Sequence, residues 1–227
     1  MSTPFTGGAV AAARRYDAWF ERRWGRYAWR LEATTVLAAA GPLAGRQVID
    51  VGCGTGRLTA LMAARGARVV GVDTDPAMLA VAATRVVGRL VRADAALLPL
   101  PDASVDAAVT VATLEFTTDP ARVLAEMARV TRSGGRLVAA VLNPASPWGW
   151  AGRVRHHAPY QQGCFLPRDR LLELGRRHGT AQVRGVLFAA ERLPFLPQLG
   201  PILETAGRLA PVLGAVQVLT VERGLPR

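Results

Sequence analysis

The chain has 227 residues, half of them apolar and a fifth charged, which suits a globular domain able to bury a full sheet with helices on both faces. Its formal charge of +11 would usually suggest nucleic acid or an anionic membrane as a partner. All of the basic residues are arginines, however, and they are spread along the chain rather than gathered into one stripe. The charge therefore favours an acidic partner only weakly, and we expect no nucleic acid.

The remaining composition excludes several classes of protein. Cys53 and Cys164 lack CxxC spacing and only three histidines accompany them, so neither a metal site nor a disulfide framework is expected. The N-terminal segment has no basic residue before its alanine-rich patch, and no window of 18 apolar residues is free of charge or proline. We therefore expect neither a signal peptide nor a transmembrane segment, and a cytoplasmic location. The sequence leaves the oligomeric state open.

The first 142 residues have a regular pattern. Residues 9–22 and 26–40 are predicted to be amphipathic helices. Short apolar, β-branched segments then alternate with helical ones, which predicts a parallel, doubly wound sheet. The predicted strands are 46–51, 67–72, 88–94, 104–113 and 135–142, and the predicted helices between them are 56–65, 75–86 and 119–130. Asp75 and Asp119 are expected to cap the last two helices, and Pro120 suits a first helical turn.

The pattern is less regular after residue 142. Turn-forming and aromatic residues over 143–165 predict a long functional loop. A helix at 167–179 and strands at 181–190 and 214–223 follow, with a proline-punctuated apolar stretch at 193–214 between the two strands. Seven strands result. The prediction is an α/β, Rossmann-like, doubly wound, seven-stranded, mostly parallel sheet with an N-terminal helical lid.

The segment VIDVGCGTGRLTA, residues 48–60, contains the main chemical signal, a turn through Gly52, Gly54 and Gly56. A dinucleotide fold requires Gly-x-Gly-x-x-Gly, and here Arg57 stands where the third glycine should be. The Gly-Lys-Ser/Thr ending of a phosphate loop is also absent. Asp50, just before the turn, would repel a phosphate but suits a positively charged ligand. The turn therefore predicts close backbone approach to a ligand without a pyrophosphate.

Two further carboxylates follow neighbouring strands. Asp73 ends the second strand, where an acidic side chain accepts hydrogen bonds from ribose hydroxyls. Asp94 ends the third strand and can accept from an adenine amine. With Asp50, these groups meet at one edge of a parallel sheet. The arrangement fits adenosine joined to a cationic group, as in S-adenosylmethionine.

At this point the sequence resembles the class I S-adenosylmethionine-dependent methyltransferases, close to the small-molecule branch of ubiquinone and menaquinone biosynthesis. Four blocks match in order: VIDVGCGTG, GVDTDPAML, ADAALLPLPDASVDAAV and LEFTTDPARVLAEMARVTRSGGRLV. YDAWF and GRYAWRLE resemble a preface common in this branch, and the resemblance covers about residues 16–190. The chain departs from the usual pattern at Ser133, Val105 and Phe116, and the last of these removes a polar group from the site.

The resemblance implies roles for particular residues. Asp50 and the Gly52–Gly56 turn would meet the methionine end, Asp73 the ribose and Asp94 the adenine. The Thr113–Glu115 segment would close the site. The implied cofactor site consists of Asp50, Gly52, Cys53, Gly54, Gly56, Asp73, Thr74, Met78, Asp94, Ala95, Thr113 and Tyr16. We expect Cys53 to be buried and unreactive.

The resemblance also implies one domain, 1–227, with a lid at 1–40, a cofactor-binding core at 41–142 and an acceptor-side part at 143–227. Methyl transfer from a sulfonium is an in-line displacement that requires no metal and no covalent nucleophile. A catalytic residue is not assigned. The candidates are His156, His157, Glu115 and Tyr16; either histidine could be a base or part of a solvated loop, and Tyr16 could be a core residue of the lid or a contact of cofactor and acceptor.

The acceptor would be held by the parts outside the sheet, and their apolar content favours an apolar or lipid-like small molecule. Two other functions stay open. A nucleic-acid (RNA) methyltransferase would explain the charge, although the Asn/Asp-Pro-Pro-aromatic segment that grips a flipped base is missing. A non-catalytic S-adenosylmethionine-binding module is the other.

Overall fold

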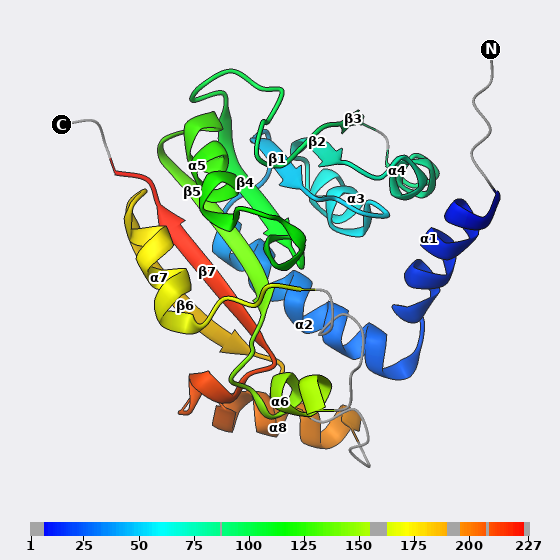
Figure 1. Cartoon of the computed structure of the whole chain (residues 1–227), viewed down its shortest axis with the longest axis vertical. Coiled ribbons are helices and arrows are strands. Elements are labelled where there is room, and N and C mark those ends of the chain that lie inside the picture. The colour runs from blue at the N-terminus through cyan, green and yellow to red at the C-terminus, as the bar shows by residue number, and fades with distance from the viewer. Residues whose placement is uncertain (1–6, 87, 155–162, 190–195, 208, 225–227) are drawn as a thin grey trace.

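The computed structural model describes residues 7–86, 88–154, 163–189, 196–207 and 209–224. Its described strands are β1 (Gln47–Val51), β2 (Arg68–Asp73), β3 (Arg89–Arg92), β4 (Val105–Val111), β5 (Thr131–Leu142), β6 (Thr180–Val186) and β7 (Val216–Glu222). They form one sheet in the order β3-β2-β1-β4-β5-β7-β6 (Figure 1). Strands β1 to β5 run parallel, and β7 is antiparallel to both of its neighbours. The predicted doubly wound, mostly parallel sheet is confirmed.

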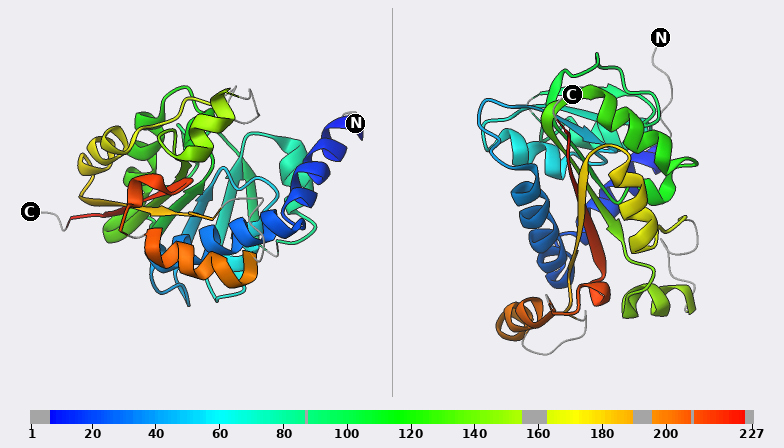
Figure 2. Two further views of the ribbon diagram at one scale, coloured as in Figure 1. Left: turned by 90° about the horizontal axis from the view of Figure 1, so that it is seen from below. Right: turned by 90° about the vertical axis from the view of Figure 1, so that its left-hand side faces the viewer.

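Helices cover both faces of this sheet. α2 (Arg23–Ala40) and α3 (Arg57–Ala63) pack on one face, and α5 (Pro120–Val130) and α7 (Arg168–Arg176) pack on the other (Figure 2). Successive side chains of β1 point to opposite faces, so that Val48 packs with α2 and α3 while Ile49 packs with α5 and α7. Burial of both faces explains why the strands read as continuous apolar runs.

Two helix starts follow the sequence prediction. α4 (Pro76–Ala82) is capped by Asp75, whose side chain accepts a hydrogen bond from the Ala77 N–H at 2.7 Å. α5 is capped by Asp119, which accepts from the Arg122 N–H at 3.0 Å. Both caps satisfy amide groups that have no partner inside the helix.

The segment 143–165, predicted to be a long loop, contains the helix α6 (Pro147–Val154), so that prediction is wrong for these residues. Asn143 and Ser146 organise its start. The Asn143 amide donates to the Val212 and Gly214 carbonyls at 2.8 Å each, and the Ser146 hydroxyl accepts from the Gly149 N–H at 3.0 Å. These side-chain bonds start a helix in a stretch whose glycines and prolines favour a loop. His156 and His157 lie outside the described residues, as does Tyr160.

The C-terminal part also differs from the sequence prediction. β6 ends at Val186 rather than residue 190, because Leu187 has a φ of 65° and the next amides leave the sheet. The Glu204 carboxylate accepts from the N–H groups of Leu187 and Phe188 at 3.1 and 2.7 Å. The apolar stretch 193–214 contains α8 (Leu196–Gly207) and the short 3-10 helix η2 (Pro211–Leu213).

The N-terminal helix α1 (Gly7–Trp19) packs against α4 rather than against the sheet. Ala13 of α1 is buried with Ala77 and Val81 of α4, and Met78 packs beside them. The buried face of α2, by contrast, belongs to the core beside the sheet. Within the described residues, no helix is both long enough and apolar enough to cross a membrane.

Candidate functional site

Most of the residues predicted to bind the cofactor lie at the edge where the parallel strands β1 to β4 end; Tyr16 and Met78 come from α1 and α4. The strand order at this edge is β3-β2-β1-β4 (Figure 1). The chain segments that follow these strands therefore lie in the order Asp94, Asp73, the glycine turn after β1, and Thr113 after β4. The strand order reverses between β1 and β4, the position at which open α/β sheets bind their ligands.

The three glycines of the turn serve different purposes. All have left-handed φ values, 71° at Gly52, 52° at Gly54 and 77° at Gly56. A Cβ on Gly52 would lie 2.2 Å from the Thr113 hydroxyl, and one on Gly56 would lie 2.8 Å from Val86. A Cβ on Gly54 would meet nothing within 4 Å. Gly52 and Gly56 therefore allow tight packing inside the protein, whereas Gly54 faces open space.

The Asp73 side chain connects this turn to the end of β2. One carboxylate oxygen accepts from the Gly54 N–H at 2.8 Å, and the other accepts from the Asp75 N–H at 2.9 Å. Each oxygen retains a lone pair for a ligand hydroxyl. Asp94 is similar, since one of its oxygens accepts from the Ala96 N–H at 2.8 Å. Both carboxylates are thus held in place by backbone bonds.

The other predicted cofactor residues have ordinary local contacts. Ala95 is buried beneath the edge, and the Thr74 carbonyl accepts from the Arg92 side chain at 3.1 Å. The Thr113 hydroxyl donates to the Val111 carbonyl at 3.1 Å. Met78 of α4, by contrast, packs in the contact between α4 and α1.

Asp50 is a buried carboxylate without a positive partner among the described residues. It is 2% exposed, and one oxygen accepts from the Thr59 hydroxyl at 2.5 Å. Burial, together with the charge of Asp73, raises the pKa of Asp50 to about 7. Cys53 is buried, and burial raises the pKa of its thiol. A positively charged ligand would stabilise the Asp50 carboxylate.

A crevice opens above the turn between the sheet edge and the N-terminal helices. It is lined by Tyr16, Phe20, Trp29, Glu32, Asp50, Gly52, Cys53, Gly54, Thr55, Arg57, Leu58, Val111 and Ala112. The Tyr16 side chain is half exposed, but burial of its hydroxyl and the nearby Glu32 carboxylate raise its pKa to about 12. Tyr16 is therefore neutral at physiological pH. Ala112 has a φ of 49°, a strained backbone geometry of the kind found at functional sites.

The Asp17 carboxylate connects α1 to the glycine turn and to Arg85, which follows α4. Asp17 accepts hydrogen bonds from the Thr55 hydroxyl at 2.7 Å, from Arg57 Nε at 2.7 Å and from both terminal nitrogens of Arg85 at 2.8 and 2.7 Å. We call these four residues the Asp17 cluster. Burial opposes ionisation of Asp17, but the bonds from Arg85, Arg57 and Thr55 hold its pKa well below the usual range. Arg57 also lies over the Phe20 ring, 5.0 Å from its centre.

Glu115, a candidate from the sequence, lies in the 3-10 helix η1 (Leu114–Phe116) beyond the end of β4. It is 1% exposed, and its Oε1 accepts from the Leu142 N–H at 2.5 Å. Burial raises its pKa to about 7 in spite of this bond. Of the four catalytic candidates, the described structure thus contains Glu115 and Tyr16.

Sequence reasoning missed Asp17, Arg85 and Glu32. In the segment YDAWF the resemblance assigns a role only to Tyr16, and no spacing rule connects Asp17 with an arginine 68 positions later. Glu32 has the pattern of an ordinary polar position in an amphipathic helix. These residues become recognisable only when α1 and α2 are placed beside the sheet edge.

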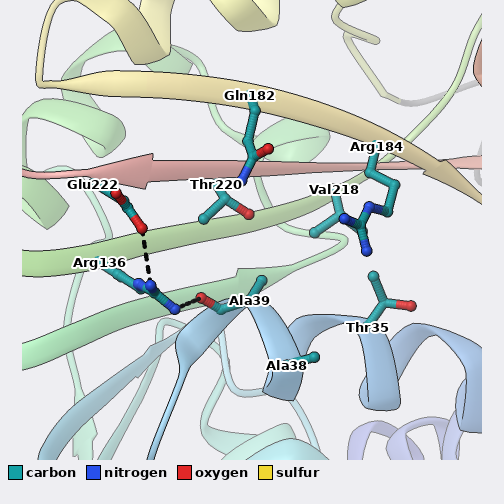
Figure 3. A pocket seen from close by; sticks show the side chains of 9 residues that line it. All are labelled: Thr35, Ala38, Ala39, Arg136, Gln182, Arg184, Val218, Thr220 and Glu222. Atoms are coloured by element: carbon teal, nitrogen blue, oxygen red, sulfur yellow. Dashed lines mark hydrogen bonds and ion pairs between the residues drawn. The ribbon is translucent and has the colours of Figure 1, made fainter.

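A second pocket lies between α2 and strands β5, β7 and β6, away from the crevice (Figure 3). Arg136 in its wall donates to the Ala39 carbonyl at 3.3 Å and pairs with Glu222 at 2.8 Å. None of the residues predicted to bind the cofactor lines this pocket.

Comparisons with known proteins identify methyltransferases as similar to this chain. Residues 49–139 match the family model described as a methyltransferase domain. A demethylmenaquinone methyltransferase of Clavibacter sepedonicus is 39% identical over 114 residues, covering 48% of this chain and 45% of the relative. An uncharacterized methyltransferase of Mycobacterium tuberculosis is 44% identical over 140 residues, covering 60% of this chain and 51% of the relative. The chain spans about half the length of the curated relatives it matches.

Among solved structures, a similar one is an S-adenosylmethionine-dependent methyltransferase of Thermotoga maritima described as a possible histamine N-methyltransferase. It aligns with a TM-score of 0.74 and 24% identity, covering 94% of this chain and 96% of that one. At this identity the likeness establishes the fold, and it extends to the helices outside the matched domain.

Proposed function

We propose that the protein is a class I methyltransferase that uses S-adenosylmethionine as its cofactor and transfers the methyl group to a small molecule; the match of residues 49–139 to a methyltransferase domain supports this. The observation that carries the proposal is the space above Gly54. It adjoins the anchored carboxylate of Asp73 and the buried Asp50, which has no cation beside it among the described residues. The turn therefore suits a ligand that brings both ribose hydroxyls and positive charge.

The proposed cofactor-binding residues fall into groups, each of which would hold a different part of the cofactor. Asp73 would accept from the ribose hydroxyls, and Asp94 with the Ala95 backbone would bind the adenine. Asp50 and the turn would meet the methionine end, with Tyr16 above them. The complete proposed set is Asp50, Gly52, Cys53, Gly54, Gly56, Asp73, Thr74, Met78, Asp94, Ala95, Thr113 and Tyr16.

When bound, the cofactor supplies a methyl group already activated by a sulfonium, so the protein needs chiefly to align the acceptor and exclude water. α1 suits the second task, because the Asp17 cluster holds it across the turn and Phe20 packs under Arg57. Tyr16, neutral at physiological pH, can donate a hydrogen bond without changing the charge of the crevice.

Apolar surroundings support an apolar acceptor. The aromatic rings of Tyr16, Phe20 and Trp29 line the crevice. Farther out, α6, α8 and η2 expose apolar side chains, among them Trp150, Ile202 and Val212. The Clavibacter relative is named a demethylmenaquinone methyltransferase. These features favour a small acceptor over a nucleic acid.

The test uses cofactor labelled in its methyl group, incubated with the protein and fractionated cell extract. Label should appear in a small-molecule fraction and should be insensitive to nuclease treatment. Asp73→Ala should weaken S-adenosylhomocysteine binding by roughly 1.5–3 kcal/mol, at least tenfold, by calorimetry. Asp119→Asn, which alters a cap away from the crevice, should leave binding unchanged.

Three results would contradict the proposal. Unchanged affinity in folded Asp73→Ala protein would show that the ribose assignment is wrong. Nuclease-sensitive label would favour the nucleic-acid alternative. Tight cofactor binding without transfer to any fraction would favour a non-catalytic binding module.

A further inference from the structure

One end of the molecule exposes apolar side chains that the proposed cofactor site does not use. α6, α8 and η2 lie together at the end where β5 and β6 finish (Figure 1 and Figure 2). Hydrogen bonds hold them there: the Asn143 amide before α6 donates to the Val212 carbonyl in η2, and the Glu204 carboxylate of α8 accepts from the Phe188 N–H after β6. We call the exposed apolar side chains of this region the apolar end: Trp150, Leu199, Ile202, Leu209, Val212 and Leu213.

The helix α8 has an inner face and an outer face of different character. Gly200 and Glu204 lie one turn apart on the inner face. A Cβ on Gly200 would lie 2.5 Å from the Tyr27 hydroxyl of α2, and the same hydroxyl donates to Glu204 at 3.4 Å. Leu199 and Ile202 therefore project from the opposite side of the helix. Ile202 is 63% exposed, so the outer face of α8 is both apolar and open to solvent.

Acidic side chains do not interrupt the apolar end. Over 147–154 and 196–214 the sequence contains one acidic residue, Glu204, and its carboxylate is bonded inside the fold. Leu209, after α8, is 90% exposed. Apolar side chains grouped in this way on a surface indicate a place of interaction, because contact with water is unfavourable for them.

A group of arginines borders the apolar end. Residues 22–30, around the start of α2, contain four arginines and no acidic residue, and Tyr27 of this segment is the residue that contacts α8. Arg23 and Arg30 stand about one helical turn before and after Tyr27, on the side of α2 that faces α8. The arginines of the segment are all exposed: Arg22, Arg23, Arg26 and Arg30. Positive charge thus lies directly beside an uncharged apolar surface.

We propose that this end of the molecule binds the surface of an anionic lipid bilayer. The apolar end enters the outer part of the bilayer, while the arginines at the start of α2 meet the lipid phosphates. A second copy of the chain fits this surface less well, because a twofold contact would bring the same arginines against each other. A nucleic acid would complement the arginines but leave the apolar side chains in water.

The helix α2 borders both this surface and the crevice. Trp29 and Glu32 line the crevice, whereas Tyr27, on the other side of the helix, contacts α8. A bilayer bound at the apolar end therefore lies next to the crevice, and an apolar acceptor dissolves in the bilayer. Lipid binding does not depend on the proposed methyl transfer, so the two are tested separately.

The experiment measures binding of the full chain to sedimenting vesicles of phosphatidylcholine alone and of phosphatidylcholine and phosphatidylglycerol in equal parts. We expect binding to the mixed vesicles to be roughly tenfold tighter or more, and to weaken as salt is added. Replacing Ile202 and Leu209 together by glutamine should weaken it at least tenfold. Replacing Arg26 and Arg30 together by glutamine should also weaken it at least tenfold, at about fivefold for each charge.

Leu97→Gln and Arg65→Gln are the matched controls. Leu97 is 68% exposed, much as Ile202 is, but it follows β3 at the opposite edge of the sheet from β6. Arg65 is exposed in the turn after α3, at the end of the sheet where β1 and β2 begin. Neither substitution should change vesicle binding. Melting curves and S-adenosylhomocysteine binding, equal in all variants, would verify that the fold is kept.

The proposal is overturned if the mixed vesicles are not bound, if the Ile202 and Leu209 substitutions leave binding unchanged, or if the controls weaken it equally. Self-association that these two substitutions abolish, without vesicle binding, would assign the apolar end to a second copy. Binding of an RNA oligonucleotide that the Arg26 and Arg30 substitutions abolish, again without vesicle binding, would assign the arginines to a nucleic acid. Intact S-adenosylhomocysteine binding in these cases leaves the methyltransferase proposal standing.

Discussion

Gly54 and Gly45 provide a comparison at the scale of single residues. Both have left-handed φ values, 52° and 74°, and a Cβ on either would meet nothing within 4 Å. Only Gly54 lies in the crevice; Gly45 is in the turn before β1, where its N–H donates to the Gly66 carbonyl. Alanine substitutions at these two positions therefore distinguish the backbone strain of replacing a glycine from the effect of filling the crevice.

We expect Gly54→Ala and Gly45→Ala to lower the free energy of unfolding by a similar amount, roughly 1–2 kcal/mol, because alanine is strained in this backbone region. Only Gly54→Ala should also weaken S-adenosylhomocysteine binding, by tenfold or more, because its methyl group would occupy the open space above the turn. Urea unfolding and calorimetry measure the two effects. Equal affinities in the two variants would mean that the ligand does not approach Gly54.

At the scale of elements, the Asp17 cluster determines how α1 is attached. Asp17→Asn removes the charge that faces Arg57 and Arg85, and we expect amide hydrogen exchange in α1 to accelerate at least tenfold, while the strands exchange as before. Glu21→Gln is the matched control, since Glu21 also pairs with Arg57 but its side chain is 65% exposed. Exposed pairs contribute roughly 0–1 kcal/mol, so exchange should change little. Equal acceleration in both variants would rule out a special role for Asp17.

The lowered pKa of Asp17 determines how the stability of the α1 attachment changes with pH. Stabilisation by its charged form is fully present above the unfolded pKa of about 3.8 and is lost as the pH falls through the lower folded value. The ratio of the α1 exchange rates in Asp17→Asn and in the unaltered protein should therefore be constant from pH 5 to 8. This ratio should approach one in acid, because protonation of Asp17 removes the same charge that the Asn substitution removes.

At the scale of the whole molecule, the sheet edge distinguishes between classes of adenosine-containing ligand. Arg57 occupies the third glycine position of the dinucleotide motif, and its guanidinium is bound to Asp17 and Glu21 rather than free for a phosphate. Asp50 beneath the turn adds negative charge. We expect S-adenosylhomocysteine to raise the melting temperature and NAD or NADP at equal concentration not to do so. A comparable shift with NAD would show that the turn accepts a pyrophosphate.

The sequence by itself determined the features that depend on neighbours along the chain. The strand–helix alternation, the caps at Asp75 and Asp119, and the glycine turn between β1 and α3 all follow from short-range backbone chemistry. The strand ends carrying Asp73 and Asp94 could be placed together because parallel strands end at one edge. The same reasoning failed at α6, where Asn143 and Ser146 start a helix through bonds that include a partner about 70 residues away.

Only the tertiary structure decided how the crevice is closed and charged. Asp17 meets Arg57 and Arg85 across 40 and 68 residues, and Glu32 of α2 lines the same crevice as the turn after β1. Periodicity marks all of these as polar positions and nothing more. Charge interactions depend on distance and burial, and both are fixed only when helices pack on the sheet. Asp17 and Glu32 would be solvated on isolated helices, but in the folded chain Asp17 attaches α1 to the turn and Glu32 lines the crevice.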